Sequence, residues 1–391
     1  MNESLISSPA GVLAVLAAVT SFFFFLEKKT GWKLFNYFPP LLFIYVLPVF
    51  LSNGGLIPGH SPVYDFMGDN LLPMFLTIML LNVDILATVR IMGRGVFVML
   101  LGTLGVVIGA PIGYFIVKHG LSPEAWQAFG VLSGSWIGGT GNMLAVARMV
   151  NLNESSIEFG YAVIADNAVY LIWLPIMLGS KNLAGWFHKF TGVSSKRLDQ
   201  METRSKELIK DKGKMEMRHF LYLAFFGFAV TALSTWLAGL IPEVEPYLST
   251  STYKILLVTF LGIVLSFTRA SKIPGSHAMA MALVYLFVAR MGAKADLSDV
   301  SPAIFWFLLG AYIWIFIHGF FLVGAAKMFK VDVHTAAIAS AANIGGAASA
   351  PIVAAYHNPT LVPISILMAL LGYAIGNPAG YVAAMLCRLV S

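Results

Sequence analysis

Two short segments, 207 residues apart, place paired glycines and small polar side chains inside apolar sequence. The first runs Ser133-Gly-Ser-Trp-Ile-Gly-Gly-Thr-Gly-Asn142, and the second runs Ser340-Ala-Ala-Asn-Ile-Gly-Gly-Ala-Ala-Ser349. A helix broken at glycine exposes N–H groups at the start of one half and C=O groups at the end of the other. Such N–H groups attract a carboxylate, and free carbonyls can hold Na⁺. The pattern therefore predicts a site for an anionic solute and a cation.

The candidate substrate site is expected between the two motifs. Its predicted residues are Ser135, Gly138, Gly139, Thr140, Asn142, Asn343, Gly345, Gly346 and Ser349. Small residues also let membrane helices pack closely, which is the alternative explanation for one Gly-Gly pair. Two pairs at matching positions in the middle of apolar segments favour a binding site.

Asp166 is a carboxylate near the middle of an apolar segment, followed by Asn167. Because an ionisable residue at membrane depth is costly, it usually has a functional task. Asp166 is predicted to bind a coupling ion, either Na⁺ or a proton, with Asn167 and Asn377 contributing. The corresponding part of the second half holds Asn377 and no acid, which favours one ion site. A structural acid paired to a polar neighbour is the alternative.

The composition is that of a polytopic, all-α membrane protein. Of 391 residues, 58% are hydrophobic and 11% are charged, against about 25% charged in soluble domains. The single cysteine, Cys387, excludes an intrachain disulfide. Because most of the net charge of +6 lies in one connector, it indicates topology rather than nucleic-acid binding. With no Walker motif, zinc-ligand spacing or nucleophile elbow, we expect neither an enzyme nor a cofactor beyond the coupling ion.

Twelve apolar segments are long enough to be membrane candidates. They fall at 9–26, 34–52, 70–89, 95–117, 124–150, 158–180, 219–241, 253–268, 276–292, 302–326, 334–357 and 360–389. The predicted organisation is a first membrane repeat at 1–180, a basic cytoplasmic connector at 181–218 and a second, inverted repeat at 219–391.

Charge in the loops indicates that one segment of the first half does not cross. Lys and Arg mark the cytoplasmic side, and they occur in the loops after the first and third segments and in the connector. Six crossings would place the connector outside. Segment 124–150, with Gly138-Gly139 near its midpoint, is therefore predicted to be a re-entrant hairpin, and segment 334–357 likewise. Each half then crosses about five times, which makes the halves inverted repeats. A discontinuous helix that crosses, with an additional crossing elsewhere, is the alternative.

The twin Ile-Gly-Gly motifs, Ala-Asp166-Asn167, Gly376-Asn377-Pro378 and Lys294-Ala-Asp296-Leu resemble the bacterial integral-membrane family catalogued as domain of unknown function 819, over nearly the whole chain. More distantly, the chain resembles sodium/glutamate symporters, 2-hydroxycarboxylate transporters and bile-acid sodium symporters. Gly138-Gly139-Thr140-Gly141 matches the Gly-Gly-x-Gly loop of the first two, whereas the second copy lacks the last glycine. This resemblance implies an elevator-type carrier.

The expected function is secondary active transport of a small, carboxylate-bearing anion with Na⁺ or H⁺ across the bacterial cytoplasmic (inner) membrane. The expected partners are the solute and the lipid bilayer, without nucleic acid, and a homodimer is left open. The alternatives are a cation/proton antiporter, a membrane-embedded sensor or enzyme, and a scaffold that transports nothing.

Overall fold

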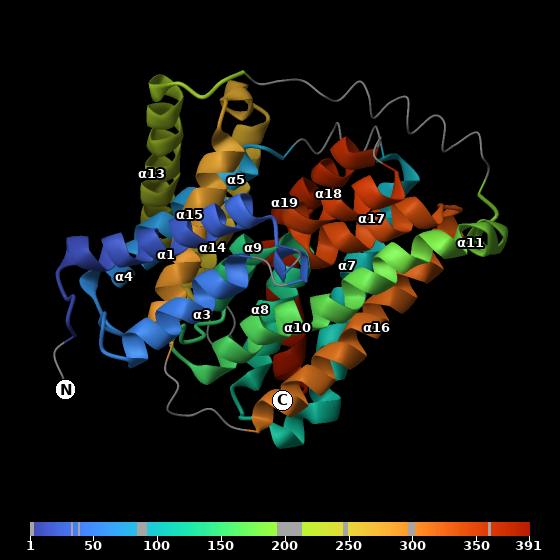
Figure 1. Cartoon of the computed structure of the whole chain (residues 1–391), viewed down its shortest axis with the longest axis horizontal. Coiled ribbons are helices and arrows are strands. Elements are labelled where there is room, and N and C mark those ends of the chain that lie inside the picture. Colours follow the sequence, from blue (N-terminus) through green and yellow to red (C-terminus); the bar gives the residue numbers. More distant parts are fainter. Residues whose placement is uncertain are drawn as a thin grey trace.

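The computed structural model describes residues 4–32, 34–37, 40–83, 92–193, 213–244, 249–295, 302–358 and 361–391. In these ranges the regular structure is entirely helical (Figure 1). Seven of the described helices are long and apolar enough to cross a membrane. They are α1 (Pro9–Thr30), α7 (Arg94–Val117), α10 (Ile157–Gly179), α13 (Met217–Gly239), α15 (Ser276–Lys294), α16 (Ala303–Phe329) and α19 (Val362–Leu389). The prediction of an all-α polytopic membrane protein is confirmed.

Shorter helices complete both halves of the chain. They are α2 (Leu34–Tyr37), α3 (Pro40–Asn53), α4 (Pro62–Phe66), a π-helical turn (Met67–Leu71), α5 (Leu72–Leu80) and α14 (Thr250–Ser266). Serine side chains cap several helix starts: Ser8 begins α1, Ser61 begins α4, Ser156 begins α10 and Ser249 begins α14. Each serine oxygen accepts a backbone N–H that would otherwise lack a partner.

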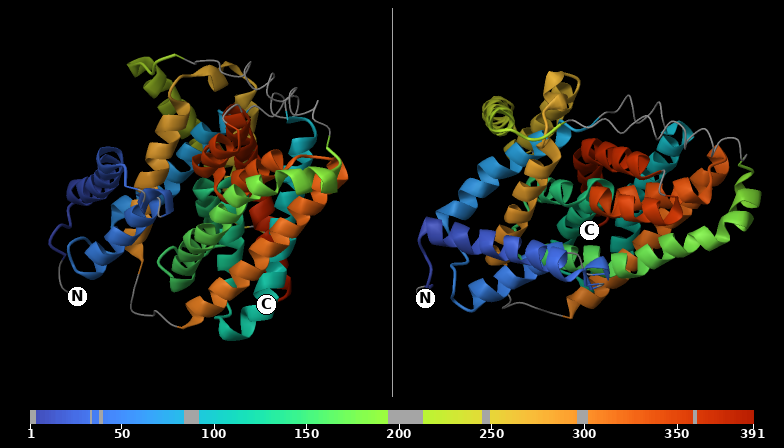
Figure 2. Two further views of the ribbon diagram at one scale, coloured as in Figure 1. Left: turned by 45° about the vertical axis from the view of Figure 1, so that its right-hand side comes forward. Right: turned by 45° about the horizontal axis from the view of Figure 1, so that its top comes forward.

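The helices form two bundles, and each bundle draws on both halves of the chain (Figures 1 and 2). The side bundle contains α1, α3, α4 and α5 from the first half and α13, α14 and α15 from the second. The hairpin bundle contains α7 to α10 from the first half and α16 to α19 from the second, and its closest packing joins α7 to α16 and α8 to α19. The early elements of each half thus build one bundle, and the late elements build the other.

Each Gly-Gly segment folds into a helical hairpin in the hairpin bundle. The first consists of α8 (Ala125–Gly138) and α9 (Thr140–Met149), and the second of α17 (Val333–Ile344) and α18 (Gly346–His357). At the base of the first, Gln127 Nε2 donates to the Val150 carbonyl at 2.7 Å. At the base of the second, His334 Nδ1 and His357 Nδ1 lie 3.0 Å apart. A continuous helix would separate such residues by about 34 Å, so the chain reverses direction in both segments.

The hairpin bases and tips keep the spacing of the sequence motifs. His334 and His357 follow Gln127 and Val150 by the same 207 residues that separate the two Gly-Gly pairs. Gly139 and Gly346, which share this spacing, both have positive φ, of 78° and 57°. A Cβ placed on Gly346 would lie 3.7 Å from the Cα of Gly139, so the two tips touch.

Gly139→Ala should destabilise the protein by about 1–3 kcal/mol and impair any activity that depends on the hairpin tips. The cause is backbone strain, because φ of 78° with ψ of −173° is accessible essentially to glycine alone, although a Cβ there would meet nothing closer than 3.7 Å. Gly179→Ala is the matched control, since Gly179 has a helical backbone and nothing within 4 Å of an added Cβ. Thermal unfolding of the detergent-solubilised variants measures both effects. Equal melting temperatures would contradict the prediction.

The predicted connector at 181–218 begins as helical structure. A 3₁₀ turn (Ser180–Leu183) leads into α11 (Ala184–Thr191), which packs against α16 and α17. In this helix the Phe187 side chain is buried, and Lys327 of α16 lies 4.1 Å from the Phe190 ring centroid. Residues 194–212, which hold much of the predicted basic charge, lie outside the described residues.

Candidate functional site

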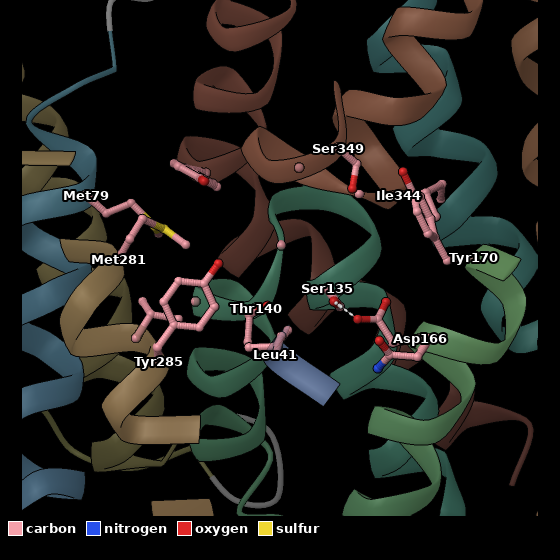
Figure 3. A pocket seen from close by; sticks show the side chains of 17 residues that line it. Leu41, Met79, Ser135, Thr140, Asp166, Tyr170, Met281, Tyr285, Ile344 and Ser349 are labelled. Atoms are coloured by element: carbon pink, nitrogen blue, oxygen red, sulfur yellow. Dashed lines mark hydrogen bonds between the residues drawn. The ribbon is translucent and has the colours of Figure 1, made fainter. Parts of the chain in front are cut away.

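A cavity of about 110 Å³ lies where the two hairpin tips meet the side bundle (Figure 3). It is lined by Leu41, Met79, Ser135, Gly139, Thr140, Gly141, Asp166, Asn167, Tyr170, Met281, Val284, Tyr285, Ile344, Gly345, Gly346, Ser349 and Tyr373. Both Gly-Gly motifs and Asp166 therefore border one space, although they are far apart in the sequence.

The two walls of the cavity come from different bundles and differ in polarity. The hairpin bundle contributes the carboxylate and amide of Asp166 and Asn167, and hydroxyls that include those of Ser135, Thr140 and Ser349. The side bundle contributes four apolar side chains and one tyrosine: Leu41, Met79, Met281, Val284 and Tyr285. None of the described lining residues is Lys, Arg or His. The cavity thus has one ionisable carboxylate and no cationic side chain to balance it.

Asp166 is positioned by α10 and by the first hairpin. The Ser135 hydroxyl, on α8, donates to Asp166 Oδ2 at 3.0 Å (Figure 3). Asn167 donates its Nδ2 to the Val163 carbonyl at 2.8 Å, one turn earlier in the same helix. Asp166 is partly buried and faces the cavity. Its carboxylate and the Ser135 hydroxyl are oxygen atoms of the kind that coordinate Na⁺ in carriers.

The starts of α9 and α18 also face the cavity. Their N-cap residues, Gly139 and Gly345, provide no side-chain hydrogen bond to the helix start. Two other helices of this bundle have side-chain caps, α10 from Ser156 and α17 from Asp332, whereas α7, α8, α16 and α19 also begin without one. The first N–H groups of α9 and α18 lack intrahelical acceptors, and the helix dipole adds partial positive charge there. These helix starts supply the partial positive charge that the lining side chains lack.

The structure places eight of the predicted site residues at the cavity: Ser135, Gly139, Thr140, Asp166, Asn167, Gly345, Gly346 and Ser349. Gly138, Asn142, Asn343 and Asn377 do not line it. Asp296, part of a quoted motif, lies outside the described residues.

Three predicted asparagines fasten the hairpins instead of facing the cavity. Asn142 Nδ2 donates to the Tyr373 carbonyl at 3.0 Å and to Asn377 Oδ1 at 2.7 Å. Asn377 Nδ2 in turn donates to Thr259 Oγ1 at 2.6 Å, and Asn377 does not line the cavity that Asp166 faces. Asn343 Nδ2 donates to the Met99 carbonyl at 3.1 Å. Buried amides of this kind need partners, and neighbouring helices supply acceptors for all three Nδ2 groups.

Gly138 has a packing role. A Cβ at this position would collide with the Asn142 side chain and the Gly372 carbonyl, so glycine lets α8 and α19 approach closely. Gly138 does not line the cavity, because its position faces α19, whereas the next residue, Gly139, faces the cavity.

Several lining residues were not predicted. Tyr170 had a usable signal, because it follows Asp166 by one helical turn and therefore shares its face. The side-bundle residues Met79, Met281 and Tyr285 had none, since they belong to no motif and reach the cavity only through tertiary packing.

A second polar region joins the two bundles. Glu154, in the loop after α9, is 4% exposed and contacts three cations. Its Oε1 lies 2.8 Å from Arg148 Nε, and its Oε2 lies 2.5 Å from Arg290 NH1 and 3.4 Å from Lys294 Nζ. Arg290, on α15, is fully buried, and its Nε donates to the Tyr64 carbonyl at 2.5 Å. This charge cluster connects the hairpin bundle to the side bundle.

The electrostatics of the charge cluster favour the ionised carboxylate. Burial alone would raise the pKa of Glu154, but attraction to Arg290, Arg148 and Lys294 outweighs burial and holds that pKa below its usual value. An adjacent cavity of about 240 Å³ is lined by Ala147, Arg148, Asn151, Leu152, Asn153, Glu154, Ser251 and Lys294.

In the described part of the chain, no group of three or more His, Cys, Asp or Glu side chains is arranged to hold a metal ion. His318, which lies in an apolar segment, is buried between other polar groups. Its Nδ1 lies 2.8 Å from the Gly102 carbonyl, and its Nε2 lies 3.0 Å from Ser340 Oγ. These bonds tie α16 to α7 and α17.

Comparison with known proteins supports the membrane assignment. Residues 14–390 match the family described as "Protein of unknown function (DUF819)". The chain is also similar to a curated protein, "Uncharacterized membrane protein YjcL" of Bacillus subtilis (strain 168). The two are 26% identical over 382 residues, which cover 95% of this chain and 94% of that protein.

Proposed function

The chain belongs to the DUF819 family of proteins of unknown function, and we propose that it is a secondary active transporter that moves a small, carboxylate-bearing anion with Na⁺ or H⁺. One observation carries this proposal: two glycine-tipped hairpins, one from each half of the chain, meet at a cavity that holds one carboxylate. In secondary carriers, broken helices at membrane depth are where substrates and coupling ions bind.

The proposed topology is two inverted repeats, with five crossings and one re-entrant hairpin in each. Contacts between helix ends support it, because they sort the ends into two sets. One set contains the pairs Asn53–Ala295, Met149–Thr252 and Lys118–Val390; the other contains Asn82–Ser276, Arg94–Phe329 and Lys181–Tyr356. Because α7 and α15 each have one end in each set, the sets correspond to opposite membrane faces. The first hairpin then enters from one face and the second from the other.

Cysteine labelling should find both ends of each hairpin on one membrane face. Single cysteines at Glu124 and Asn153, in a Cys387→Ser background, should react with an impermeant maleimide from the same side. Cysteines at Lys330 and Asn358 should both react from the opposite side. Lys181→Cys is the control, because α10 separates it from residue 153 by a full crossing. Labelling of positions 124 and 153 from opposite sides would contradict the re-entrant hairpin.

The proposed transport motion moves the hairpin bundle against the side bundle, as in an elevator. Most of the polar lining belongs to the hairpin bundle, whereas the side bundle contributes four apolar side chains and the Tyr285 hydroxyl. Bound solute and cation would therefore keep most of their polar contacts while the hairpin bundle slides, and contacts with side-bundle residues such as Met79 and Met281 would change. This mechanism rests on the architecture and is a proposal.

Asp166 is the proposed coupling residue. Its carboxylate would bind Na⁺ or a proton, and the cation would offset the charge of a solute carboxylate at the starts of α9 and α18. A single carboxylate in the cavity also suits a second function, cation/proton antiport. Proton flux driven by a Na⁺ gradient, with no organic solute present, would favour antiport over symport.

The proposed location is the bacterial cytoplasmic membrane, as a multi-pass protein. Lipid and the transported solute are the proposed partners, with no role for nucleic acid, and a homodimer stays open. We assign no enzymatic activity.

Reconstitution in proteoliposomes tests the proposal directly. Purified protein should accumulate a small carboxylate when an inward Na⁺ or proton gradient is imposed, and accumulation should stop when ionophores collapse that gradient. Protein-free liposomes are the control for passive flux, and Gly179→Ala protein should transport as the unmodified protein does. A complete absence of gradient-driven flux, for organic solutes and for protons alike, would contradict transport.

A further inference from the structure

The two walls of the cavity restrict the shape of the solute. We propose, resting on the transporter function above, that the solute is a monocarboxylate of about three or four carbons. Its carboxylate lies against the hairpin bundle, and its apolar body faces the side bundle.

The apolar wall argues against a second charged group. Leu41, Met79, Met281 and Val284 form most of the side-bundle lining, and none of them can pair with an anion. A dicarboxylate that binds through one end at the hairpin tips would place its other carboxylate near this wall, where Tyr285 offers one neutral hydroxyl. Burial of an unpaired charge is costly, and no described lining residue is a cation that would offset it.

Tyr170 and Ser349 identify the position of the carboxylate. The Tyr170 hydroxyl oxygen is buried beside Ser349 and makes no hydrogen bond of standard geometry with the described residues. Figure 3 shows both side chains at the same end of the cavity. Ser349 lies in the first turn of α18, which begins at Gly346. Two hydroxyl donors and an uncapped helix start are the groups that a carboxylate accepts hydrogen bonds from. Tyr170 is therefore assigned as a specificity residue.

Asp166 distinguishes a simple carboxylate from an amino acid. It lies one helical turn before Tyr170, so a cation bound there sits beside the solute carboxylate and neutralises it. The ammonium of an α-amino acid would have to occupy the same place as the coupling cation. The site thus favours the solute without an amino group.

The volume of the cavity, which is open on one side, indicates the length of a solute that it can hold entirely. An apolar cavity of about 150 Å³ admits benzene, and this cavity measures about 110 Å³. A solute of about four to six non-hydrogen atoms therefore fits, which corresponds to propanoate or butanoate.

Three acids with the same number of carbons test the proposal. Isothermal titration of the full-length, detergent-solubilised protein, with and without Na⁺ at pH 7, compares propanoate, malonate and alanine. Propanoate should bind, and malonate and alanine should each bind at least tenfold more weakly. Malonate binding as tightly as propanoate overturns the apolar-wall argument. Alanine binding as tightly as propanoate, or more tightly, assigns Asp166 to an ammonium group and overturns the monocarboxylate class.

Tyrosine variants test the assigned position. Tyr170→Phe should weaken propanoate binding about tenfold without changing its Na⁺ dependence. Tyr312→Phe is the matched control, because that hydroxyl donates to the Ala168 carbonyl at 3.0 Å, outside the cavity. Unchanged affinity in Tyr170→Phe overturns the carboxylate position. Binding of none of the three acids overturns the substrate class, whereas the transporter proposal falls only if gradient-driven flux is also absent.

Discussion

Asp166→Asn should abolish cation-driven uptake, with a loss of about 100-fold or more. Such a loss corresponds to about 2.7 kcal/mol of transition-state or coupling free energy. Asparagine has the same shape and keeps an oxygen that can accept from Ser135, whose hydroxyl lies 3.0 Å from Asp166 Oδ2. It cannot bind a proton at neutral pH and lacks the charge that attracts Na⁺. The fold should therefore survive while coupling is lost.

The measurement is uptake in proteoliposomes across a range of Na⁺ concentrations and pH values. Glu124→Gln is the control, because it removes an exposed carboxylate outside the cavity. Its uptake should match that of the unmodified protein. If Asp166→Asn transports at a normal rate and keeps its cation dependence, Asp166 is not the coupling residue. If it binds solute normally but exchanges it without a cation gradient, the solute site is separate from the coupling site.

The hairpins could be predicted from sequence because the two signals for them, glycine backbone conformation and loop charge, do not depend on tertiary packing. Gly139 and Gly346 require a backbone conformation that other residues avoid, so paired glycines mark the reversal directly. The Lys and Arg residues in the loops indicate which loops are cytoplasmic, and therefore how many segments cross the membrane. This inference needs no tertiary information. Asp166 could be identified for a similar reason, since a carboxylate in an apolar segment is costly and therefore usually has a function.

The asparagines show where that reasoning ends. Within α9, Asn142 follows Thr140 by two positions, which places the two side chains on different faces of the helix. Which face meets the cavity depends on the packing of α9 against α19, where Asn142 finds Tyr373 and Asn377. A break in a helix also resets its rotation, so periodicity before Gly139 does not carry past it. Contacts between bundles, including Met79 and Tyr285 at the cavity, likewise depend on tertiary packing alone.

The charge cluster was missed although it had a signal. Arg290 falls inside an apolar segment, where an ionisable residue calls for a partner. Its partner, Glu154, lies 136 residues earlier in a loop with no distinctive motif. Sequence alone therefore indicates that Arg290 needs an anion but does not identify which one.

Glu154→Ala should destabilise the protein by about 3–5 kcal/mol. The substitution leaves the fully buried Arg290 guanidinium without its carboxylate, and an unpaired buried charge costs more than the pair contributes. Glu216→Ala is the matched control, because Glu216 also pairs with an arginine but both side chains are more than half exposed. Because Glu216 also caps the start of α13, Glu216→Ala should cost about 1–2 kcal/mol, still less than Glu154→Ala. Denaturation in detergent at pH 7 compares the two variants.

The pH dependence of stability separates lost charge pairing from lost packing. The pKa of Glu154 is below its usual value in the folded protein, so the unfolded state binds more protons in the acidic range and stability rises with pH there. The contribution of Glu154 to folding stability is complete above the ordinary carboxyl pKa of about 4.3. It is lost as the pH falls through the lower pKa that Glu154 has in the folded protein. Glu154→Ala should flatten this slope, whereas Glu216→Ala should retain it.

Adding Arg290→Met to Glu154→Ala should recover much of the stability at pH 7, since the buried charge is then gone. A double variant no more stable than Glu154→Ala would attribute the loss to packing rather than to the unpaired guanidinium.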